Sequence, residues 1–153
     1  MKRILVIHGP NLNLLGEREP EIYGSQTLEE LNAEIRRCAE QRNLDVKFFQ
    51  SNHEGAIIDV LQNERHWAEG IVINPGALTH YSYALRDAIA SLRLPAVEVH
   101  LSDIYQREEF RRVSVIAPVC LAQVSGKGHQ SYLVAIERLL TEAKGLDFDR
   151  RLK

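Results

Sequence analysis

A long polar segment, which we expect to be a structureless loop, follows the first apolar run of the chain and carries side chains that could do chemistry. Residues 3–26 begin with a short apolar run, pass a Gly-Pro pair and continue with Asn11, Asn13, Arg18 and Tyr23. A phenol is a weak base at neutral pH because its ordinary pKa is about 10, but a nearby guanidinium favours the phenolate. Tyr23 is therefore a candidate base, with Arg18 and Arg107 as candidate sources of positive charge. Taken alone, Tyr23 also fits a partly buried loop aromatic.

A second group of titratable side chains lies in the middle of the chain. Glu98 and His100 are two residues apart, so on a strand their side chains point the same way. A carboxylate beside an imidazole can fix its tautomer and hold it ready for proton transfer. A solvent-facing pair at a strand end has the same spacing, and both interpretations stay open. His80 and Asp87 are seven residues apart, which places them on one face of a helix, although either could be an ordinary surface residue.

Several other chemistries lack their signatures. No GxGxxG follows the first apolar run, and residues 126–128 lack the spacing of a Walker loop. His53 and His66 lack the partners of a zinc site, and neither a Cys-x-x-Cys nor a Gly-x-Ser-x-Gly motif occurs. None of the five lysines lies inside an apolar strand run, so a desolvated Schiff-base lysine is poorly supported. We therefore expect no metal, no cofactor and no imine.

Composition is that of an ordinary globular chain. The 153 residues are 44% hydrophobic and 26% charged, and the net charge of -2 gives no general attraction to nucleic acid or anionic membranes. The apolar runs are strand-sized and no signal-peptide pattern is present, so we expect neither a membrane span nor export. Cys38 and Cys120 lie in apolar, periodic contexts, which favours buried free thiols and a cytoplasmic location.

Five strand-like runs alternate with helical patterns. The expected strands are residues 4–7, 46–50, 70–74, 96–100 and 119–124. Helices are expected after capping boxes at residues 27–30 and 51–54, over residues 79–92 with Ala84 facing inward, over residues 108–112, and over residues 133–143. This alternation predicts an α/β fold, a flavodoxin-like three-layer sandwich whose parallel sheet has strand order 2-1-3-4-5. We expect one domain, residues 1–145, followed by a loosely held charged tail, residues 146–153.

Polar residues gather where three of the predicted strands end. In such a sheet, ligands bind beyond the carboxyl ends of the strands, near the point where the strand order reverses. Asn11, Arg18 and Tyr23 follow the first strand, residues 74–80 follow the third, and residues 98–111 follow the fourth. These strands are adjacent in the predicted order, so the sequence predicts one active site at this edge.

Four blocks of the sequence resemble the type II 3-dehydroquinate dehydratase family. They are GPNLNLLGEREPEIYG, FQSNHEGAIIDVLQ, GIVINPGALTHYSYALRDAI and LPAVEVHLSDIYQREEFRRVS, in the family's order. The resemblance implies a cofactor-free anti elimination of water from 3-dehydroquinate through an enolate, without an imine, giving 3-dehydroshikimate in the shikimate pathway of aromatic amino-acid biosynthesis. It also implies a homo-oligomer in which trimers assemble into a dodecamer.

The resemblance further implies a catalytic role for each candidate. Tyr23 matches the family's proton acceptor, and Arg18 matches the residue that activates it. Asn11 would hold a water against the developing enolate oxygen. His100 matches the acid that protonates the departing hydroxyl, with Glu98 as its partner.

Substrate-binding positions are implied in the same way: Asn74, Gly76, Ala77, His80, Asp87, Leu101, Ser102, Arg107 and Arg111. Asn74 and the backbone amides of Leu101 and Ser102 would bind the substrate carboxylate. His80, Arg111 and Asp87 would hold the ring hydroxyls, with Asp87 coming from a neighbouring subunit.

Two alternatives remain at this point. A flavodoxin-like binding or signalling module without catalysis would need neither Tyr23 nor His100, and a receiver domain would carry aspartates where Asn11 and Asn13 stand. An enzyme of the same fold acting on another cyclic hydroxy-acid is the second.

Overall fold

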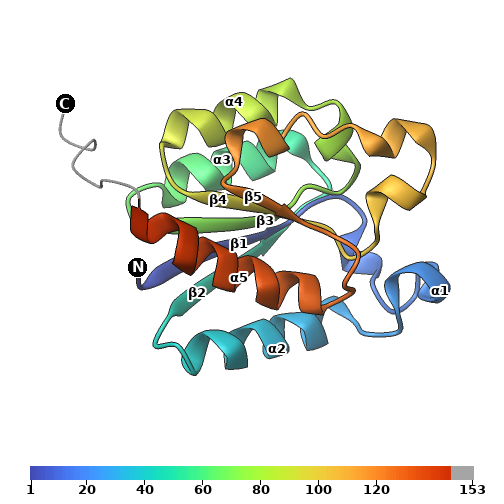
Figure 1. Cartoon of the computed structure of the whole chain (residues 1–153), viewed down its shortest axis with the longest axis horizontal. Coiled ribbons are helices and arrows are strands. Elements are labelled where there is room, and N and C mark those ends of the chain that lie inside the picture. Colours follow the sequence, from blue (N-terminus) through green and yellow to red (C-terminus); the bar gives the residue numbers. More distant parts are fainter. Residues whose placement is uncertain (146–153) are drawn as a thin grey trace.

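A parallel sheet of five strands forms the centre of the computed structural model, which describes residues 1–145 (Figure 1). The strands are β1 (Arg3–His8), β2 (Asp45–Gln50), β3 (Gly70–Asn74), β4 (Ala96–Val99) and β5 (Ala122–Val124). They pair in the order β2-β1-β3-β4-β5, and every pair is parallel. The predicted fold class and strand order are confirmed. Every residue of β3 is buried, because helices cover both faces of the sheet.

Two pairs of helices form the outer layers. Helices α2 (Leu28–Glu40) and α5 (Gln130–Glu142) lie on one face of the sheet, and α3 (Glu54–Glu64) and α4 (Tyr83–Leu92) lie on the other (Figure 1). Ile4 and Val6 of β1 pack in the core beneath α2 and α5, whereas Leu5 and Ile7 pack in the core beneath α3 and α4. Position along a strand therefore decides which layer a side chain faces.

Short elements complete the described chain: η1 (Leu12–Leu14), α1 (Pro20–Tyr23), η2 (Gly76–His80), η3 (Ile104–Gln106), η4 (Glu109–Arg112), η5 (Ala117–Val119) and η6 (Ala143–Gly145). The short helix expected near residues 108–112 is η4, a 3-10 helix. Within residues 1–145, no helix is both long enough and apolar enough to cross a bilayer.

The N-terminus of α2 is built as the sequence predicts. The Thr27 hydroxyl accepts a hydrogen bond from the Glu30 amide, and the Glu30 carboxylate accepts one from the Thr27 amide. Leu31, Ile35 and Cys38 form the buried stripe of the helix. Each end of the capping box satisfies an amide that the helix leaves without a partner.

The capping box expected at residues 51–54 is wrong. The Ser51 hydroxyl accepts from the His53 amide, and the Glu54 carboxylate instead accepts from the Ser82 hydroxyl. Ser82 in turn caps α4, because its hydroxyl accepts from the Leu85 amide. The helix expected over residues 79–92 therefore starts only at residue 83, and residues 76–80 form η2 instead.

Five smaller expectations also need correction. The polar segment after β1 is not structureless, since it contains η1 and α1, and Ala84 is exposed rather than facing inward. The fifth strand begins at residue 122, because η5 occupies the residues before it, and α5 begins three residues earlier than expected. Cys38 and Cys120 are free thiols as predicted, but Cys120 is only half-buried. The predicted tail, residues 146–153, lies outside the described residues.

The turns that follow β1 and β3 touch one another. The Gly9 amide donates to the Asn74 carbonyl at 2.7 Å. A Cβ atom on Gly9 would lie 2.5 Å from the carbonyl oxygen of Pro75, which is closer than atoms in van der Waals contact can approach. Gly76 has a φ of 58°, in the left-handed region that favours glycine. The two strand ends therefore meet only because Gly9 has no side chain.

We expect Gly9→Ala to destabilise the fold by about 1–3 kcal/mol or more, because its Cβ would overlap backbone that cannot move independently of β3. Gly55→Ala is the matched control, since a Cβ at that helical position meets nothing within 4 Å and alanine favours helix by about 0.5–1 kcal/mol. Urea unfolding of both variants at one protein concentration checks this. A Gly9→Ala protein as stable as the parent would contradict the expectation.

Candidate active site

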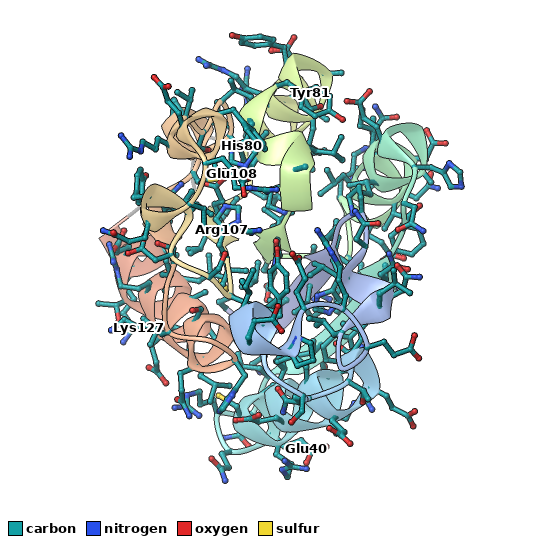
Figure 2. All side chains as sticks on the ribbon, turned by 90° about the vertical axis from the view of Figure 1, so that its right-hand side faces the viewer. Glu40, His80, Tyr81, Arg107, Glu108 and Lys127 are labelled. Atoms are coloured by element: carbon teal, nitrogen blue, oxygen red, sulfur yellow. The ribbon has the colours of Figure 1, made fainter. Side chains whose placement is uncertain are left out.

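A cavity of about 240 Å³ lies at the carboxyl edge of the sheet. Figure 2 looks toward this end of the molecule, where the labelled His80 and Arg107 lie. The cavity is lined by Pro10, Asn11, Leu12, Arg18, Tyr23, Asn74, Gly76, Ala77, His80, His100, Leu101, Ser102, Ile104, Arg107 and Arg111. Of the residues that the sequence singles out for the site, only Glu98 and Asp87 are not part of this lining.

Tyr23 lies between two arginines. The Arg107 Nη1 donates to the Tyr23 hydroxyl at 2.6 Å, and the guanidinium carbons of Arg18 and Arg107 lie 5.3 and 5.4 Å from the centre of its ring. Arg18 also lies 3.4 Å from the Glu19 carboxylate, so part of its charge is compensated. Arg107 is therefore the direct partner of the phenol. Two guanidinium groups therefore lie within 5.4 Å of the Tyr23 ring centre.

Glu98 and His100 form a buried pair, so the solvent-facing interpretation is wrong. The His100 Nε2 lies 3.1 Å from the Glu98 Oε1, at ion-pair distance although not in line for a straight hydrogen bond. Glu98 is 0% exposed and His100 is 5% exposed. Burial alone would raise the pKa of Glu98, but His100 and the hydroxyl donors around it hold that pKa below its ordinary value. The carboxylate stays ionised beneath the imidazole.

Three neutral donors that sequence reasoning missed surround the Glu98 carboxylate. The hydroxyl of Thr79 donates to Oε1, as does the hydroxyl of Ser114 at 2.7 Å. The Gln123 Nε2 donates to Oε2, also at 2.7 Å. Gln123 had a sequence signal, because it is a polar residue in the middle of a predicted buried strand, and it pairs in register with Glu98.

His80 and Asp87 do not share a helical face, because α4 starts only after His80. The His80 Nδ1 donates to the Val113 carbonyl at 2.7 Å, so its Nε2 carries no proton when the ring is neutral. Burial lowers the pKa of His80, which favours that neutral ring. Asp87 is exposed on α4. Arg111 lines the cavity and pairs with Glu108 at its edge.

Asn74 and Asn11 bring neutral polar groups to the cavity from the ends of β3 and β1. Asn74 is 3% exposed, and its Oδ1 accepts from the Gly76 amide at 3.1 Å. Asn11 is exposed at the rim and has a φ of 70°, a left-handed conformation that asparagine tolerates better than most residues. Leu101 and Ser102 continue the lining after His100.

The donors of the cavity suit a small, hydroxylated anion. Arg18, Arg107 and Arg111 supply positive charge, and no lysine is among the lining residues. Within the described part of the chain, no group of three or more His, Cys, Asp or Glu side chains could hold a metal ion. The cavity thus combines a phenol in contact with two cations and an imidazole backed by a carboxylate.

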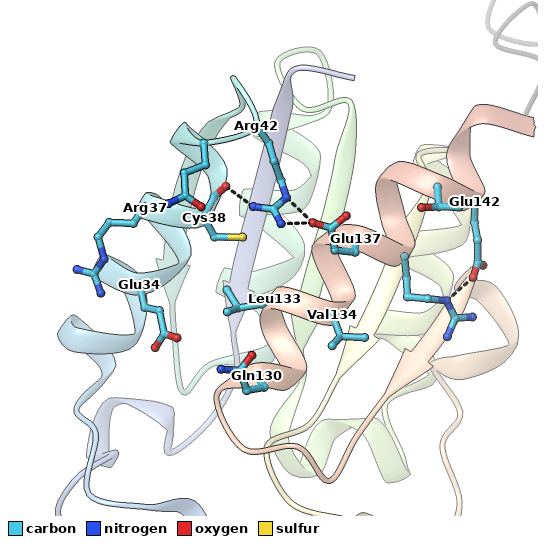
Figure 3. A pocket seen from close by; sticks show the side chains of 12 residues that line it. Glu34, Arg37, Cys38, Arg42, Gln130, Leu133, Val134, Glu137 and Glu142 are labelled. Atoms are coloured by element: carbon cyan, nitrogen blue, oxygen red, sulfur yellow. Dashed lines mark hydrogen bonds and ion pairs between the residues drawn. The ribbon is translucent and has the colours of Figure 1, made fainter.

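A larger groove of about 710 Å³ lies elsewhere, between α2 and α5 (Figure 3). Two ion pairs form among its lining residues, Arg42 with Glu137 and Arg138 with Glu142. None of the predicted site residues lines it. Its size reflects an open surface groove rather than converging polar groups, so the smaller cavity is the candidate active site.

Comparison with known proteins shows which family the chain is similar to. The sequence model of the family described as "Dehydroquinase class II" matches residues 2–140. A 3-dehydroquinate dehydratase from Roseiflexus castenholzii is 60% identical over 138 residues, which cover 90% of this chain and 88% of that protein. One from Halothermothrix orenii is 55% identical over 144 residues, covering 94% and 97%.

A solved structure gives the same result for the fold. The crystal structure of type II dehydroquinase from Butyrivibrio crossotus matches with a TM-score of 0.89 at 51% identity, covering 91% of this chain and 97% of that chain. The sequence match and the structural match both extend over nearly the whole described chain. The chain therefore belongs to the class II dehydroquinase family.

Proposed function

We propose that this protein is a hydro-lyase that converts 3-dehydroquinate to 3-dehydroshikimate in the shikimate pathway of aromatic amino-acid biosynthesis. The observation that carries the proposal is the meeting of Tyr23, two arginines and the buried Glu98–His100 pair around one cavity. Relatives with 50–60% identity carry the name of this activity. We further propose that residues 1–145 are the whole catalytic domain and that it works in the reducing cytoplasm, where its two thiols stay free.

The first half of the proposed reaction removes a proton from the carbon beside the ketone. Such a step needs a base and a group that stabilises the developing enolate oxygen. Tyr23 is the base, and Arg107 and Arg18 bring positive charge next to its ring and hydroxyl. Asn11, at the rim of the same cavity, holds a water against the enolate oxygen. The elimination is anti and needs no imine, in keeping with a lining that includes no lysine.

The second half protonates the departing hydroxyl. His100 is the acid, and the buried Glu98 carboxylate beside it fixes the orientation of the ring. Asn74 and the amides of Leu101 and Ser102 bind the substrate carboxylate. The ring hydroxyls are held by His80 and Arg111 and by Asp87 of a neighbouring subunit, while Gly76, Ala77 and Arg107 complete the binding surface.

A homo-oligomer of trimers that form a dodecamer is part of this proposal. Asp87 is exposed and lines no part of the cavity of its own chain. Tyr81, Phe110 and Val113 are 62%, 56% and 59% exposed, and they lie beside His80 in sequence or in contact with it. Exposed apolar side chains gathered beside a site are typical of a protein contact surface.

Tyr23→Phe should lower kcat by about 10²–10⁴-fold, because the base is lost, while 3-dehydroquinate binding measured by calorimetry changes little. Turnover is followed by the ultraviolet absorbance of the conjugated product. Tyr83→Phe is the matched control, since it removes an exposed hydroxyl for which the described residues offer no hydrogen-bond partner. Substantial activity in Tyr23→Phe would show that Tyr23 is only a packing residue.

His100→Ala should reduce kcat far more than it raises KM, because protonation of the leaving group matters in the transition state. Glu98→Gln should have the same effect more mildly, since the amide still contacts the ring but orients it less firmly than the carboxylate. Steady-state kinetics at several pH values separate the two parameters. A near-normal kcat in His100→Ala would remove His100 from its role.

Asp87→Ala and Tyr23→Phe should each be inactive alone but regain activity when the two chains are mixed into hybrid oligomers. A site with an intact Tyr23 can then receive an intact Asp87 from its neighbour. The test measures turnover after the two variants are unfolded and refolded together, with each refolded separately as the control. Hybrids without activity, or a fully active monomer by light scattering, would refute the shared site.

A further inference from the structure

A hydrogen-bonded row of polar side chains lies behind the cavity and plays no part in the mechanism above. His8, at the end of β1, and Tyr132, in α5, are both 0% exposed. The His8 Nδ1 lies 2.8 Å from the Tyr132 hydroxyl, and the His8 Nε2 lies 2.7 Å from the Asn32 Oδ1 of α2. None of the three lines the cavity. Buried polar groups of this kind constrain orientation, because a lost partner is costly.

This row of polar side chains ends at Asn74, which does line the cavity. His8 and Asn74 are paired in register on β1 and β3. Val72, two residues before Asn74, packs in the core beneath α2 and α5, so the side chain of Asn74 starts on the same face of the sheet as Tyr132. Asn74 therefore lies next to His8 on the face of the sheet that Tyr132 covers. Its Oδ1 accepts from the Gly76 amide.

The donor and acceptor roles along this row of side chains can be assigned from Asn32 onward. The Asn32 Oδ1 is an acceptor, so the His8 Nε2 carries the proton and Nδ1 accepts from the Tyr132 hydroxyl. The Tyr132 oxygen is then left as an acceptor, which suits an N–H of the neighbouring Asn74 amide. Burial lowers the pKa of His8 to about 4 and raises the pKa of Tyr132, so both groups stay neutral at physiological pH.

We propose that His8 and Tyr132 are positioning residues that fix the Asn74 amide, so that it presents N–H rather than C=O to the anionic group of the substrate. A flipped amide would turn its carbonyl oxygen toward that anion and repel it. The inference rests on the proposed function, in which Asn74 binds the substrate carboxylate. It assigns the specificity of that contact to residues that never touch the substrate.

The test is a double-mutant cycle in KM for 3-dehydroquinate. Tyr132→Phe should raise KM about tenfold, which is typical of one weakened hydrogen bond to a charged group, and should change kcat less than threefold. In an Asn74→Ala background, Tyr132→Phe should raise KM less than twofold further, because the residue through which it acts is gone. An unchanged KM in the single variant, or a full additional increase in the double variant, would overturn the proposal.

Two further variants separate positioning from loss of stability. His8→Gln keeps an acceptor and a donor and should retain most of the affinity, whereas His8→Phe should match Tyr132→Phe. Ile136→Val removes one methylene from a fully buried α5 residue and should leave KM unchanged while lowering stability. Equal KM effects in Ile136→Val and Tyr132→Phe would overturn the proposal.

A measurement on the ligand-free protein tests this inference independently of the proposed function. The side-chain amide protons of Asn74 should exchange slowly with water by NMR in the parent protein and quickly in Tyr132→Phe. If the parent does not turn over 3-dehydroquinate, the proposed function fails, but this comparison still decides the positioning. Equal exchange in the two proteins would overturn it.

Discussion

A carboxylate with no exposed surface sets the strictest demand on this structure. The charge of Glu98 lies on a central strand, where an unpaired ion would be very costly. Three hydrogen-bond donors and His100 surround it, and they come from η2, the segment before η5, β5 and the end of β4. Each segment must be in place for the charge to be tolerated. The same arrangement leaves the imidazole at the cavity with an anion behind it.

Backbone contact at the sheet edge gives the cavity its shape. The turns after β1 and β3 approach closely at Gly9, and Gly76 adopts a left-handed conformation against Pro10. These turns carry Asn11 and Asn74 to the same edge as His100. Parallel pairing brings the carboxyl ends of neighbouring strands together, and the glycines allow the loops beyond them to stay close enough for one small ligand. The cationic side chains then close the opposite side of the cavity.

The sequence by itself determined the architecture and most of the polar lining of the cavity. Apolar runs of strand length that alternate with helical stripes have one stable solution, a parallel sheet covered on both faces, and the observed strand order is the predicted one. The capping box at Thr27 was readable because both of its partners lie within four residues. The cavity lining was predictable because strand-end residues meet wherever parallel strands are neighbours. Local patterns and topology were sufficient for these conclusions.

Only the tertiary structure decided which partner each side chain takes. The side chain that donates to Tyr23 is Arg107 rather than Arg18, although 84 positions separate Arg107 from Tyr23. Ser82 is the N-cap of α4, which therefore starts later than the expected residue 79. The Ser82 hydroxyl is held by a hydrogen bond to the Glu54 carboxylate of α3. The contact of His8 with Tyr132 spans 124 positions and left no local pattern. A side chain with several possible partners pairs with the one that packing brings within about 3 Å, and that choice depends on the whole fold rather than on spacing along the chain.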